Sequence, residues 1–464
     1  MLVPTDAETL DPRHATDAVA LRTTRLLHAG LVRLDADTLA PQPYLASHWE
    51  WRDPRTLHVR LRTGVRFHSG APLRASDVRA TIKAFQSPEV NSRHGRVVDA
   101  IGEIDVEGDL DVVFHLKRPH ATLLTDLEIP VLRADEATSP PRPDGSLDGL
   151  GPFVVARRAY GEIELAPAKD GALPAPARSV VIRTVHDENA RALRMHAGRA
   201  DLVVNAFSPT LLPALESAPG VNVIARRGAN LTYLLVRTDR GPLADPAVRR
   251  ALARAIDRER IARTLLTGHA QAALTLLPPS HWAHTPPPPE PTKLSLADAE
   301  GVNEARGKHF TLLTSTDRLR GTIARFLAQE LAQAGITIDV VPLELGTLLG
   351  RLGAGDFELA TLQLPEMTEP NVLRVFLHSS SIPPAGANRG RVSDEVVDRL
   401  LDEGAATNDP DARRTIYGKL EARVREQALF IPLWHEDQIA VTSDRARTFV
   451  PSAEGRWLSL ASLP

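Results

Sequence analysis

The segment TLHVRLR, residues 56–62, alternates apolar and polar positions along the chain. Its leucine and valine side chains fall on one face, which is the pattern of a half-buried strand. A turn, HSGAP, follows at residues 68–72. Asp77 then lies in the first turn of a predicted helix, DVRATIKAFQ, where a carboxylate interacts favourably with the positive end of the helix. This order of strand, turn and helix is typical of α/β proteins.

Two longer stretches predict strand–helix–strand units. In residues 180–204 a strand is followed by Asp187, a suitable N-cap, and by a helix that ends at Gly198 before a second strand. Residues 310–364 repeat this order, and Gly335 ends the helix there. We therefore expect an α/β protein with helices between its strands.

The same patterns predict an early helix and a hairpin. Thr16 or Asp17 can cap an amphipathic helix that runs to about Ala29, with Gly30 closing it. Residues 101–119 alternate like the two strands of a hairpin.

Two segments rich in proline predict loops. Residues 135–148 combine proline with serine and aspartate, and residues 276–297 contain four consecutive prolines, which favour a stiff polyproline II conformation. We expect the second of these loops to lie at the surface and to be solvated.

Composition excludes several classes of function. The 464 residues are 43% hydrophobic, enough for two or three domains with sizeable cores. The net charge of −3 and the lack of a long basic run argue against nucleic-acid binding. Without cysteine there are no disulfides, thiolate metal sites or cysteine nucleophiles. No apolar run reaches the length of a membrane span, and if the protein is exported we expect its signal segment, with any lipoprotein cysteine, to have been removed.

Catalytic and metal-binding motifs are missing from the sequence. There is no GxSxG, HExxH, Walker A or EF-hand pattern, and the sixteen histidines form no i,i+4 pairs of the metal-ligand type. His68 is interpreted as a structural donor in its turn. The GLG of residues 149–151 lacks the continuation of a dinucleotide site. We expect no enzyme activity, no cofactor and no bound metal.

Residues 64–78, GVRFHSGAPLRASDV, resemble the signature GVKFHDGTPLTAEDV of the family 5 extracytoplasmic solute-binding proteins. These are the peptide, nickel and oligosaccharide receptors of ABC importers. Ser69 stands where the family usually has Asp, and Arg74 where it has a helix-capping Thr, so that cap must come from elsewhere. The matching positions are Gly64, Val65, Phe67, His68, Gly70, Pro72, Leu73, Asp77 and Val78.

Further blocks resemble the family in the same order along nearly the whole chain, least clearly at about 80–148 and 276–305. The resemblance implies an α/β, two-lobed periplasmic binding protein-like fold with mixed sheets, hinge strands and an extra insert domain in the first lobe. The strand from Tyr233 to Val236 is expected to be one hinge crossing. The expected boundaries are 1–33, 149–236 and 438–464 for the first lobe, 34–148 for the insert domain, and 237–437 for the second lobe.

The resemblance also implies a ligand site after residue 360. When Glu369-Pro370 is aligned with the family's acid-Pro step, Glu366 falls on its ligand-binding aspartate, which in the peptide receptors pairs with the α-ammonium group. Gln363 falls where the family has Trp, which removes a stacking wall. Glutamate in place of the family's aspartate and glutamine in place of its tryptophan both argue against an ordinary dipeptide or oligopeptide ligand. The alternative interpretation of Glu366 is a solvated acid in a loop.

Other candidates come from segments that the resemblance brings near the cleft. Arg389 and Arg391 could face an acidic group of the ligand or lie in a basic surface loop. Asn205 and Phe207 follow the carboxyl end of a strand, where α/β sheets bind ligands, or serve as a turn residue and a core residue. Trp434 could reach the ligand or pack in the hinge. The full candidate set is Glu366, Gln363, Glu369, Asn388, Arg389, Arg391, Asn205, Phe207, Trp434 and His435.

The resemblance implies an extracytoplasmic receptor that captures a small solute, peptide-like in the first place, in an interlobe cleft and delivers it to an ABC permease. For the solute to close the two lobes, it must bind the closed state of the receptor more tightly than the open state. A sensor or chaperone on the same fold is the alternative. We expect a periplasmic or extracytoplasmic monomer that meets the membrane through its permease or a lipid anchor. Whether the solute is a peptide, sugar, opine or metal chelate stays open.

Overall fold

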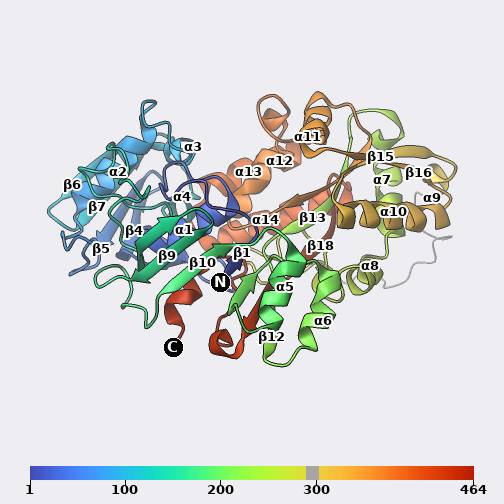
Figure 1. Cartoon of the computed structure of the whole chain (residues 1–464). Coiled ribbons are helices and arrows are strands. Elements are labelled where there is room, and N and C mark those ends of the chain that lie inside the picture. Colours follow the sequence, from blue (N-terminus) through green and yellow to red (C-terminus); the bar gives the residue numbers. More distant parts are fainter. Residues whose placement is uncertain (289–301) are drawn as a thin grey trace. The chain divides into compact units, whose positions relative to one another are not determined.

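The computed structural model describes residues 1–288 and 302–464, and the chain forms two compact units (Figure 1). The first unit comprises residues 1–226 and 438–464, and the second comprises residues 227–437. Each unit has its own mixed sheet and its own buried clusters. The part of the predicted proline-rich loop beyond residue 288 lies outside the described residues.

A seven-stranded sheet forms the centre of the first unit. The predicted unit of residues 180–204 is confirmed as β10, α5 and β11, with Asp187 capping the helix by accepting from the Ala190 N–H at 2.7 Å. The strand β1 lies between β10 and β11 and runs parallel to both. In sheet order the strands are β12 (Val221–Arg226), β19 (Gln438–Ser443), β11 (Leu202–Val204), β1 (Leu2–Val3), β10 (Val180–Thr184), β9 (Glu162–Pro167) and β8 (Phe153–Ala159).

Residues 46–116 add a second, four-stranded sheet to this unit. The predicted strand is β5, and its side chains Leu57, Val59 and Leu61 are at most 1% exposed. The predicted hairpin is formed by β6 and β7, which pair antiparallel. The strands are β4 (Ala46–Asp53), β5 (Thr56–Leu61), β7 (Asp111–Leu116) and β6 (Ile101–Glu107), and a small ladder joins β2 (Val32–Leu34) to β3 (Pro41–Pro43).

Apolar periodicity places the helices of the first unit against these sheets. In α2, Val78, Ile82 and Phe85 recur at helical spacing and pack into one cluster with the side chains of β5. The helices are α1 (Ala18–Leu27), α2 (Ala75–Gln86), α3 (Gly95–Val98), α4 (Leu123–Asp126), α5 (Glu188–His196) and α6 (Leu212–Glu216).

The second unit is built around β13, whose six residues, LTYLLV, are all buried. A short, continuous apolar run of this kind suits a strand that is covered on both faces. β13 pairs with β17 on one side and with β18 on the other. In sheet order the strands are β14 (Ala270–Ala272), β18 (Ile431–Glu436), β13 (Leu231–Val236), β17 (Leu359–Leu364), β15 (His309–Ser315) and β16 (Thr337–Leu343).

Helices cover both faces of this sheet. One buried cluster joins the sheet to α7, α8 and α10, and another joins its opposite face to α11–α14. Within the described residues, no helix is both long enough and apolar enough to cross a membrane. The helices are α7 (Pro246–Ala255), α8 (Arg258–Thr264), α9 (Val302–Ala305), α10 (Arg318–Gln333), α11 (Leu345–Ala354), α12 (Leu373–Leu377), α13 (Glu395–Ala406) and α14 (Pro410–Glu426).

Three local expectations differ from the structure. The predicted hinge at Tyr233–Val236 lies inside the second sheet, because both of its edges are hydrogen-bonded there; the chain passes between the units at residues 226 and 227 instead. α1 ends at Leu27 rather than near Ala29. Gly30 does not close that helix but permits close packing, since a Cβ there would lie 2.5 Å from the carbonyl oxygen of Glu128.

The loop after β14 is buried at its start, residues 276–278, but Pro279, Thr285, Pro286 and Pro288 are exposed, so the predicted surface loop is confirmed in part within the described residues. Leu276 and Leu277 are at most 2% exposed and belong to the apolar cluster beneath α14. The Glu421 carboxyl accepts from both of their backbone N–H groups at 2.8 Å, and burial raises its pKa to about 7. The proline content therefore marked an irregular segment, while leucines and one acid of α14 fixed it to the core.

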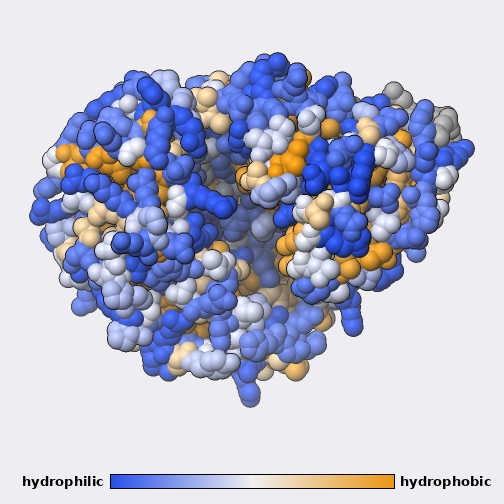
Figure 2. Space-filling view, turned by 90° about the horizontal axis from the view of Figure 1, so that it is seen from above, coloured by the Kyte–Doolittle hydropathy of each residue, from blue (hydrophilic) through white to orange (hydrophobic). Residues whose placement is uncertain are grey.

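The visible surface is mostly hydrophilic, and apolar residues lie on it in separate small groups (Figure 2). The most exposed large apolar or aromatic side chains are Tyr160 at 95% and Leu193 at 68%. Scattered exposed leucines are normal for a folded protein. Tyr160 differs from these scattered residues, because it stands beside a cavity.

Candidate functional site

The signature turn, residues 64–78, is held to the rest of the first unit by side chains that bond to backbone. The Nε2 atom of His68 lies 2.8 Å from the carbonyl oxygen of Gly151, so this histidine is structural, as predicted. Burial lowers the pKa of His68. The backbone N–H of Ser69 donates to Asp148 at 3.0 Å, and Arg133 also donates to Asp148, at 2.8 Å. Asp148 thus fixes the turn in which Ser69 replaces the family's acid.

Asp77 supplies one half of a capping box, while the Arg74 side chain makes no capping hydrogen bond. The Asp77 carboxylate reaches back to the N–H of Arg74 at 2.8 Å and also accepts from the N–H of Ala134 at 2.9 Å. Burial is the main cause that raises the pKa of this carboxyl. Gly149 and Gly151 approach the end of α1 so closely that a Cβ on either would collide with backbone carbonyl oxygens. The GLG segment is therefore a packing contact, and it belongs to the same framework.

Polar side chains of a different kind meet at one end of the second sheet. β13 begins there, and β15, β17 and β18 end there, because β13 runs antiparallel to β17 and β18 while β15 runs parallel to β17. The chain also enters and leaves the second unit at this end. We call the group of Thr232, Arg320, Gln363, Trp434 and Glu436 the crossing-end cluster. Carboxyl ends of strands are the usual place for a ligand site in open α/β sheets.

Hydrogen bonds between side chains connect this cluster. One carboxylate oxygen of Glu436 accepts from Thr232 Oγ1 at 3.1 Å, from Arg320 Nη1 at 2.9 Å and from Trp434 Nε1 at 3.3 Å. The other terminal nitrogen of Arg320 donates to Gln363 Oε1 at 3.0 Å. Arg320 lies in the first turn of α10, directly after β15. Three strands and one helix thus contribute to a single polar group.

The charged members of the cluster remain accessible to solvent. The side chain of Arg320 is 23% exposed and that of Glu436 is 25% exposed. An ion pair of this kind is neither fully screened nor sealed in the core, and its charge-assisted bonds are strong ones. Chemically, the cluster offers guanidinium donors, a carboxylate and an amide that a polar solute could share or exchange.

Two buried residues hold the end of β18 in place beneath the cluster. The Asn230 side chain donates to the Glu436 carbonyl at 2.7 Å and accepts from the Glu436 N–H at 2.8 Å. His435 is 2% exposed and bonds through Nδ1 to the carbonyl oxygen of Asn230. Burial lowers the pKa of His435 to about 4, so the ring is neutral at physiological pH. His435 and Trp434 both pack inside the second unit, and Trp434 is 0% exposed.

The acid singled out by the sequence, Glu366, follows β17 and is half-buried. No hydrogen bond or ion pair joins its side chain to any other described residue, so its carboxylate is free to take a ligand. Glu369 is engaged differently. It forms an ion pair with buried Arg413 and also accepts from the N–H of Asn371 at 3.2 Å. Breaking such a buried pair is costly, so we treat Glu369 as part of the framework.

The candidates after residue 387 divide in a similar way. Asn388 is 0% exposed, and its amide bonds to the carbonyls of Leu377, His378 and Val392 and to the Val392 N–H. Arg391 donates to the carbonyl of Ala354 at 3.4 Å, next to the end of α11. Arg389 is half-buried, and its side chain has no bond to another described residue. Asn388 therefore shapes its loop, while Arg389 keeps its donors available.

Asn205 and Phe207 belong to the first unit. Asn205 has a positive φ of 51°, and its side chain bonds to Gln438 and to the N–H of Ile439, at the start of β19. Phe207 packs beside buried Arg191, with the guanidinium carbon 5.8 Å from its ring centre. These contacts tie β11 to β19 and to α5. They give both residues a structural role within the unit.

Sequence reasoning placed Gln363 and Trp434 in the site but missed Thr232, Arg320 and Glu436. Two local signals were present. Arg320 begins the helix that follows a predicted strand, and Glu436 directly follows the matched His435. In the sequence Arg320 and Glu436 are 116 positions apart, so nothing local could pair them. Within the described part of the chain, no group of three His, Asp or Glu side chains could hold a metal ion.

Comparison with known proteins agrees with this architecture. The family model for bacterial extracellular solute-binding proteins, family 5, matches residues 40–380. The relative named probable di/tripeptide-binding protein 5, from Pseudomonas aeruginosa, is 26% identical, with 92% of this chain and 88% of that protein covered. The glutathione-binding protein of Salmonella typhi is 24% identical, with coverage of 95% and 89%.

The crystal structure of the ABC transporter substrate-binding protein CtaP from Listeria monocytogenes has the same fold. It superposes with a TM-score of 0.88 at 21% identity and covers 99% of this chain and 97% of its own. The predicted periplasmic binding protein-like fold class is thereby confirmed. The chain belongs to the bacterial extracellular solute-binding proteins, family 5, and is a solute-binding receptor of the ABC-importer type.

Proposed function

We propose that the solute is a short peptide or a peptide-like molecule, and that the crossing-end cluster together with Glu366 binds its charged ends. The observation that carries this proposal is the accessible guanidinium of Arg320, held between the carboxylate of Glu436 and the amide of Gln363. A peptide carboxylate is the natural bidentate partner of a guanidinium. Relatives whose names specify di/tripeptides and glutathione support this class of solute.

Glu366 supplies the complementary charge for an α-ammonium group. It lies three residues after Gln363, so the two Cα atoms are at most about 10 Å apart. Because Arg320 bonds to Gln363, Arg320 and Glu366 could hold the two ends of a short solute by opposite charges. Glutamate is one methylene longer than aspartate, which would bring its carboxylate further towards the ligand than the family's usual acid. Arg389, with free donors, is the further candidate for an acidic side chain of the solute.

The remaining expectations about the receptor stay proposals. Members of this family are extracytoplasmic solute-binding receptors rather than enzymes. We infer a monomer without catalytic activity, and a lipid anchor as one way of keeping it at the membrane. Capture between two lobes stays a prediction from the sequence resemblance.

Calorimetric titration of the purified chain with di- and tripeptides tests the proposal. Each peptide is compared with its N-acetylated and its C-amidated form. Free peptides should bind at least tenfold more tightly than either blocked form, because each block removes one charged end. Glu366→Gln should lose the preference for a free amino end but keep the preference for a free carboxyl end.

Glu403→Gln is the matched control, since Glu403 is an exposed acid on α13. It should bind like the native chain. If blocked and free peptides bind equally, or if a sugar or a metal chelate is bound while every peptide fails, the peptide assignment is wrong.

A further inference from the structure

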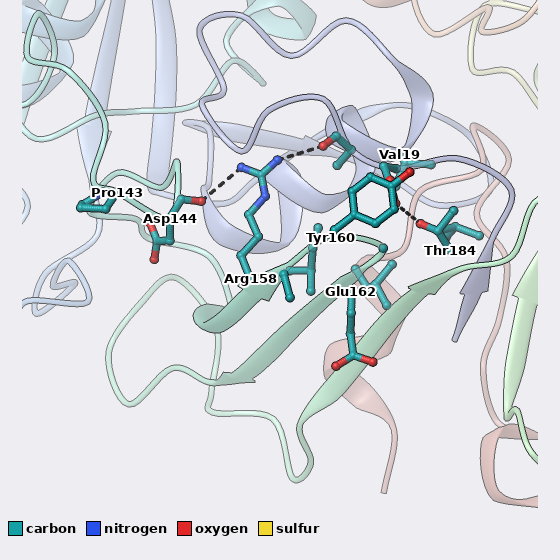
Figure 3. A pocket seen from close by; sticks show the side chains of 14 residues that line it. Val19, Pro143, Asp144, Arg158, Tyr160, Glu162 and Thr184 are labelled. Carbon is teal, nitrogen blue, oxygen red and sulfur yellow. Dashed lines mark hydrogen bonds between the residues drawn. The ribbon is translucent and has the colours of Figure 1, made fainter.

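A cavity of about 540 Å³ opens in the first unit, over the part of the sheet formed by β1, β8, β9 and β10 (Figure 3). Its floor consists of core side chains that are at most 6% exposed: Val3, Val19, Ile163 and Ile182. Small-molecule sites typically occupy about 300–1,000 Å³ and combine an apolar lining with a few polar groups. The size and the floor of this cavity therefore suit a small molecule with an apolar body.

The charged groups around the cavity are mainly carboxylates. Glu162 forms ion pairs with Arg183 and Arg157, which offset its charge. Asp6 and Asp144 form no ion pair with any described residue. The side chain of Asp6 accepts from the Thr184 hydroxyl, and Asp144 Oδ1 accepts from the backbone N–H and the hydroxyl of Ser146. Both are thus oriented by neighbours but lack a positive partner.

Arg158 is the cation of the lining, and its terminal nitrogens are already occupied. They donate to the Ala7 carbonyl at 2.9 Å and to the Asp144 carbonyl at 3.2 Å, as the dashed lines of Figure 3 show. These bonds join the segment around residue 7 to the loop around residue 144 and form one wall. An anion entering the cavity would have to displace them, which disfavours anionic ligands.

Tyr160 stands at the tip of the β8–β9 hairpin and lines the same cavity. Its side chain is 95% exposed, so it contributes almost nothing to the core. The face of an aromatic ring attracts a cation within about 6 Å. An exposed ring and an apolar floor, in a cavity whose lining includes the unpaired carboxylate of Asp6, form an arrangement suited to an organic cation.

We propose that this cavity is a second ligand site, which binds a small organic cation with an apolar body, such as an arylalkylamine. The ammonium group lies near Asp6 under the ring of Tyr160, and the apolar body covers the floor. The proposal goes beyond solute capture and does not depend on it, because every lining residue belongs to the first unit, whereas Arg320 and Glu366 belong to the second.

Titration with 2-phenylethylamine, and with the uncharged 2-phenylethanol, tests the site on the full chain by calorimetry or ligand-observed NMR. A ligand of this size should bind with a Kd on the order of 1 mM. We expect 2-phenylethylamine to bind one equivalent, and 2-phenylethanol to bind at least about tenfold more weakly, because it lacks the charge. Tyr160→Ala should weaken amine binding about fivefold, and Tyr160→Phe should restore it, because the ring provides the contact.

Asp6→Asn should weaken amine binding about threefold, because it removes a charge but keeps the oxygen that accepts from the Thr184 hydroxyl. Asp53→Asn is the matched control: Asp53 is also an acid oriented by a hydrogen bond, from the N–H of Arg55, but it does not line the cavity. Asp53→Asn should bind the amine as tightly as the native chain does, and Glu366→Gln should also keep amine binding.

Three results would each overturn the proposal. They are equal binding of the amine and the alcohol, native affinity in both Tyr160→Ala and Asp6→Asn, and loss of amine binding in Glu366→Gln. The last of these would place the amine in the solute site. Because Tyr160 is almost fully exposed, its variants should fold, and circular dichroism checks this.

Discussion

The signature turn and the crossing-end cluster are both polar, yet their side chains have different kinds of partner. In the signature turn, His68 and Asp77 bond to backbone carbonyl and N–H groups. In the crossing-end cluster, Glu436, Arg320 and Gln363 bond mainly to one another. A side chain that satisfies the backbone fixes the path of the chain. Accessible side chains that satisfy one another can exchange those bonds for a ligand.

This difference supports the proposal that the strongest family match is framework, while the solute binds elsewhere. The signature turn matches the family at most of its positions, and the structure uses those residues to join a strand, a turn and α2 into the first unit. The candidate site departs from the family at Gln363 and Glu366. Receptors that bind chemically different ligands need different side chains in the site, but they can keep the same framework.

The largest effect on stability should come from Gly149→Ala, which disturbs the packing around the signature turn but not the crossing-end cluster. A Cβ there would lie 2.8 Å from Cε1 of His68 and would collide with the Leu27 carbonyl. We expect the free energy of unfolding to fall by about 4 kcal/mol, because neither backbone can move without breaking the turn. Urea unfolding followed by circular dichroism measures this, and protein that remains folded should keep its affinity for solute.

Gly350→Ala provides the matched control. Gly350 lies in α11, and a Cβ there meets nothing within 4 Å. The substitution should raise stability by up to about 1 kcal/mol, as expected for replacing a helical glycine. Equal stability of the two alanine variants would show that the packing of residue 149 does not hold the signature turn.

His435→Asn should have the next largest effect, and its sign depends on pH. Burial lowers the pKa of His435 from 6.5 to about 4, so below pH 6.5 the unfolded chain binds a proton that the folded chain does not. The stability from the neutral ring is fully present above pH 6.5 and is lost as the pH falls towards 4, by about 3 kcal/mol in all. The Asn variant should lack this part of the pH dependence.

Measuring the urea midpoint of both proteins between pH 4 and pH 8 tests this effect. The difference between them isolates His435 from the other buried histidines. His309→Asn, at an exposed position, is the control, and it should change the urea midpoint little at pH 7.5, because a surface ion pair contributes little. His435 bonds to the backbone of Asn230 rather than to a side chain of the crossing-end cluster. His435→Asn should therefore have close to native solute affinity at pH 7.5. A parallel pH dependence in His435→Asn and the native chain would contradict the buried, neutral ring.

Arg320→Ala should have the smallest effect on stability but a clear effect on binding. It leaves the Glu436 carboxylate, which is a quarter exposed, without its cation. We expect the affinity for the best peptide of the panel to fall about 30-fold, which corresponds to roughly 2 kcal/mol. The free energy of unfolding should change by less than about 1 kcal/mol, because the pair is partly solvated.

Arg325→Ala is the control on the same helix. Arg325 is exposed, and its guanidinium bonds to Thr322 at 3.2 Å, one turn away within α10. Its removal should change neither affinity nor stability appreciably. If Arg320→Ala bound peptide as well as Arg325→Ala does, the crossing-end cluster would be framework like the signature turn, and the contrast between them would fail.

Local elements were predictable where periodicity and caps agree. The alternation of residues 56–62 fixes β5, and Asp77 marks the first turn of α2, because both signals act within a few residues. The family resemblance implies that β13 crosses between the lobes, but its apolar run suits a central strand equally well. The pairing partners, β17 and β18, lie more than a hundred residues further along the chain, and they decide between the two.

The sequence by itself determined the family and most local elements, and it singled out one acid, Glu366, as a candidate, because these depend on local pattern and on motifs in a fixed order. Tertiary structure alone decided which polar groups meet. Arg320, Gln363 and Glu436 come from separate elements and are joined only by the antiparallel and parallel register of one sheet. Side-chain hydrogen bonds act over about 3 Å, a distance that no spacing along the chain specifies for residues so far apart.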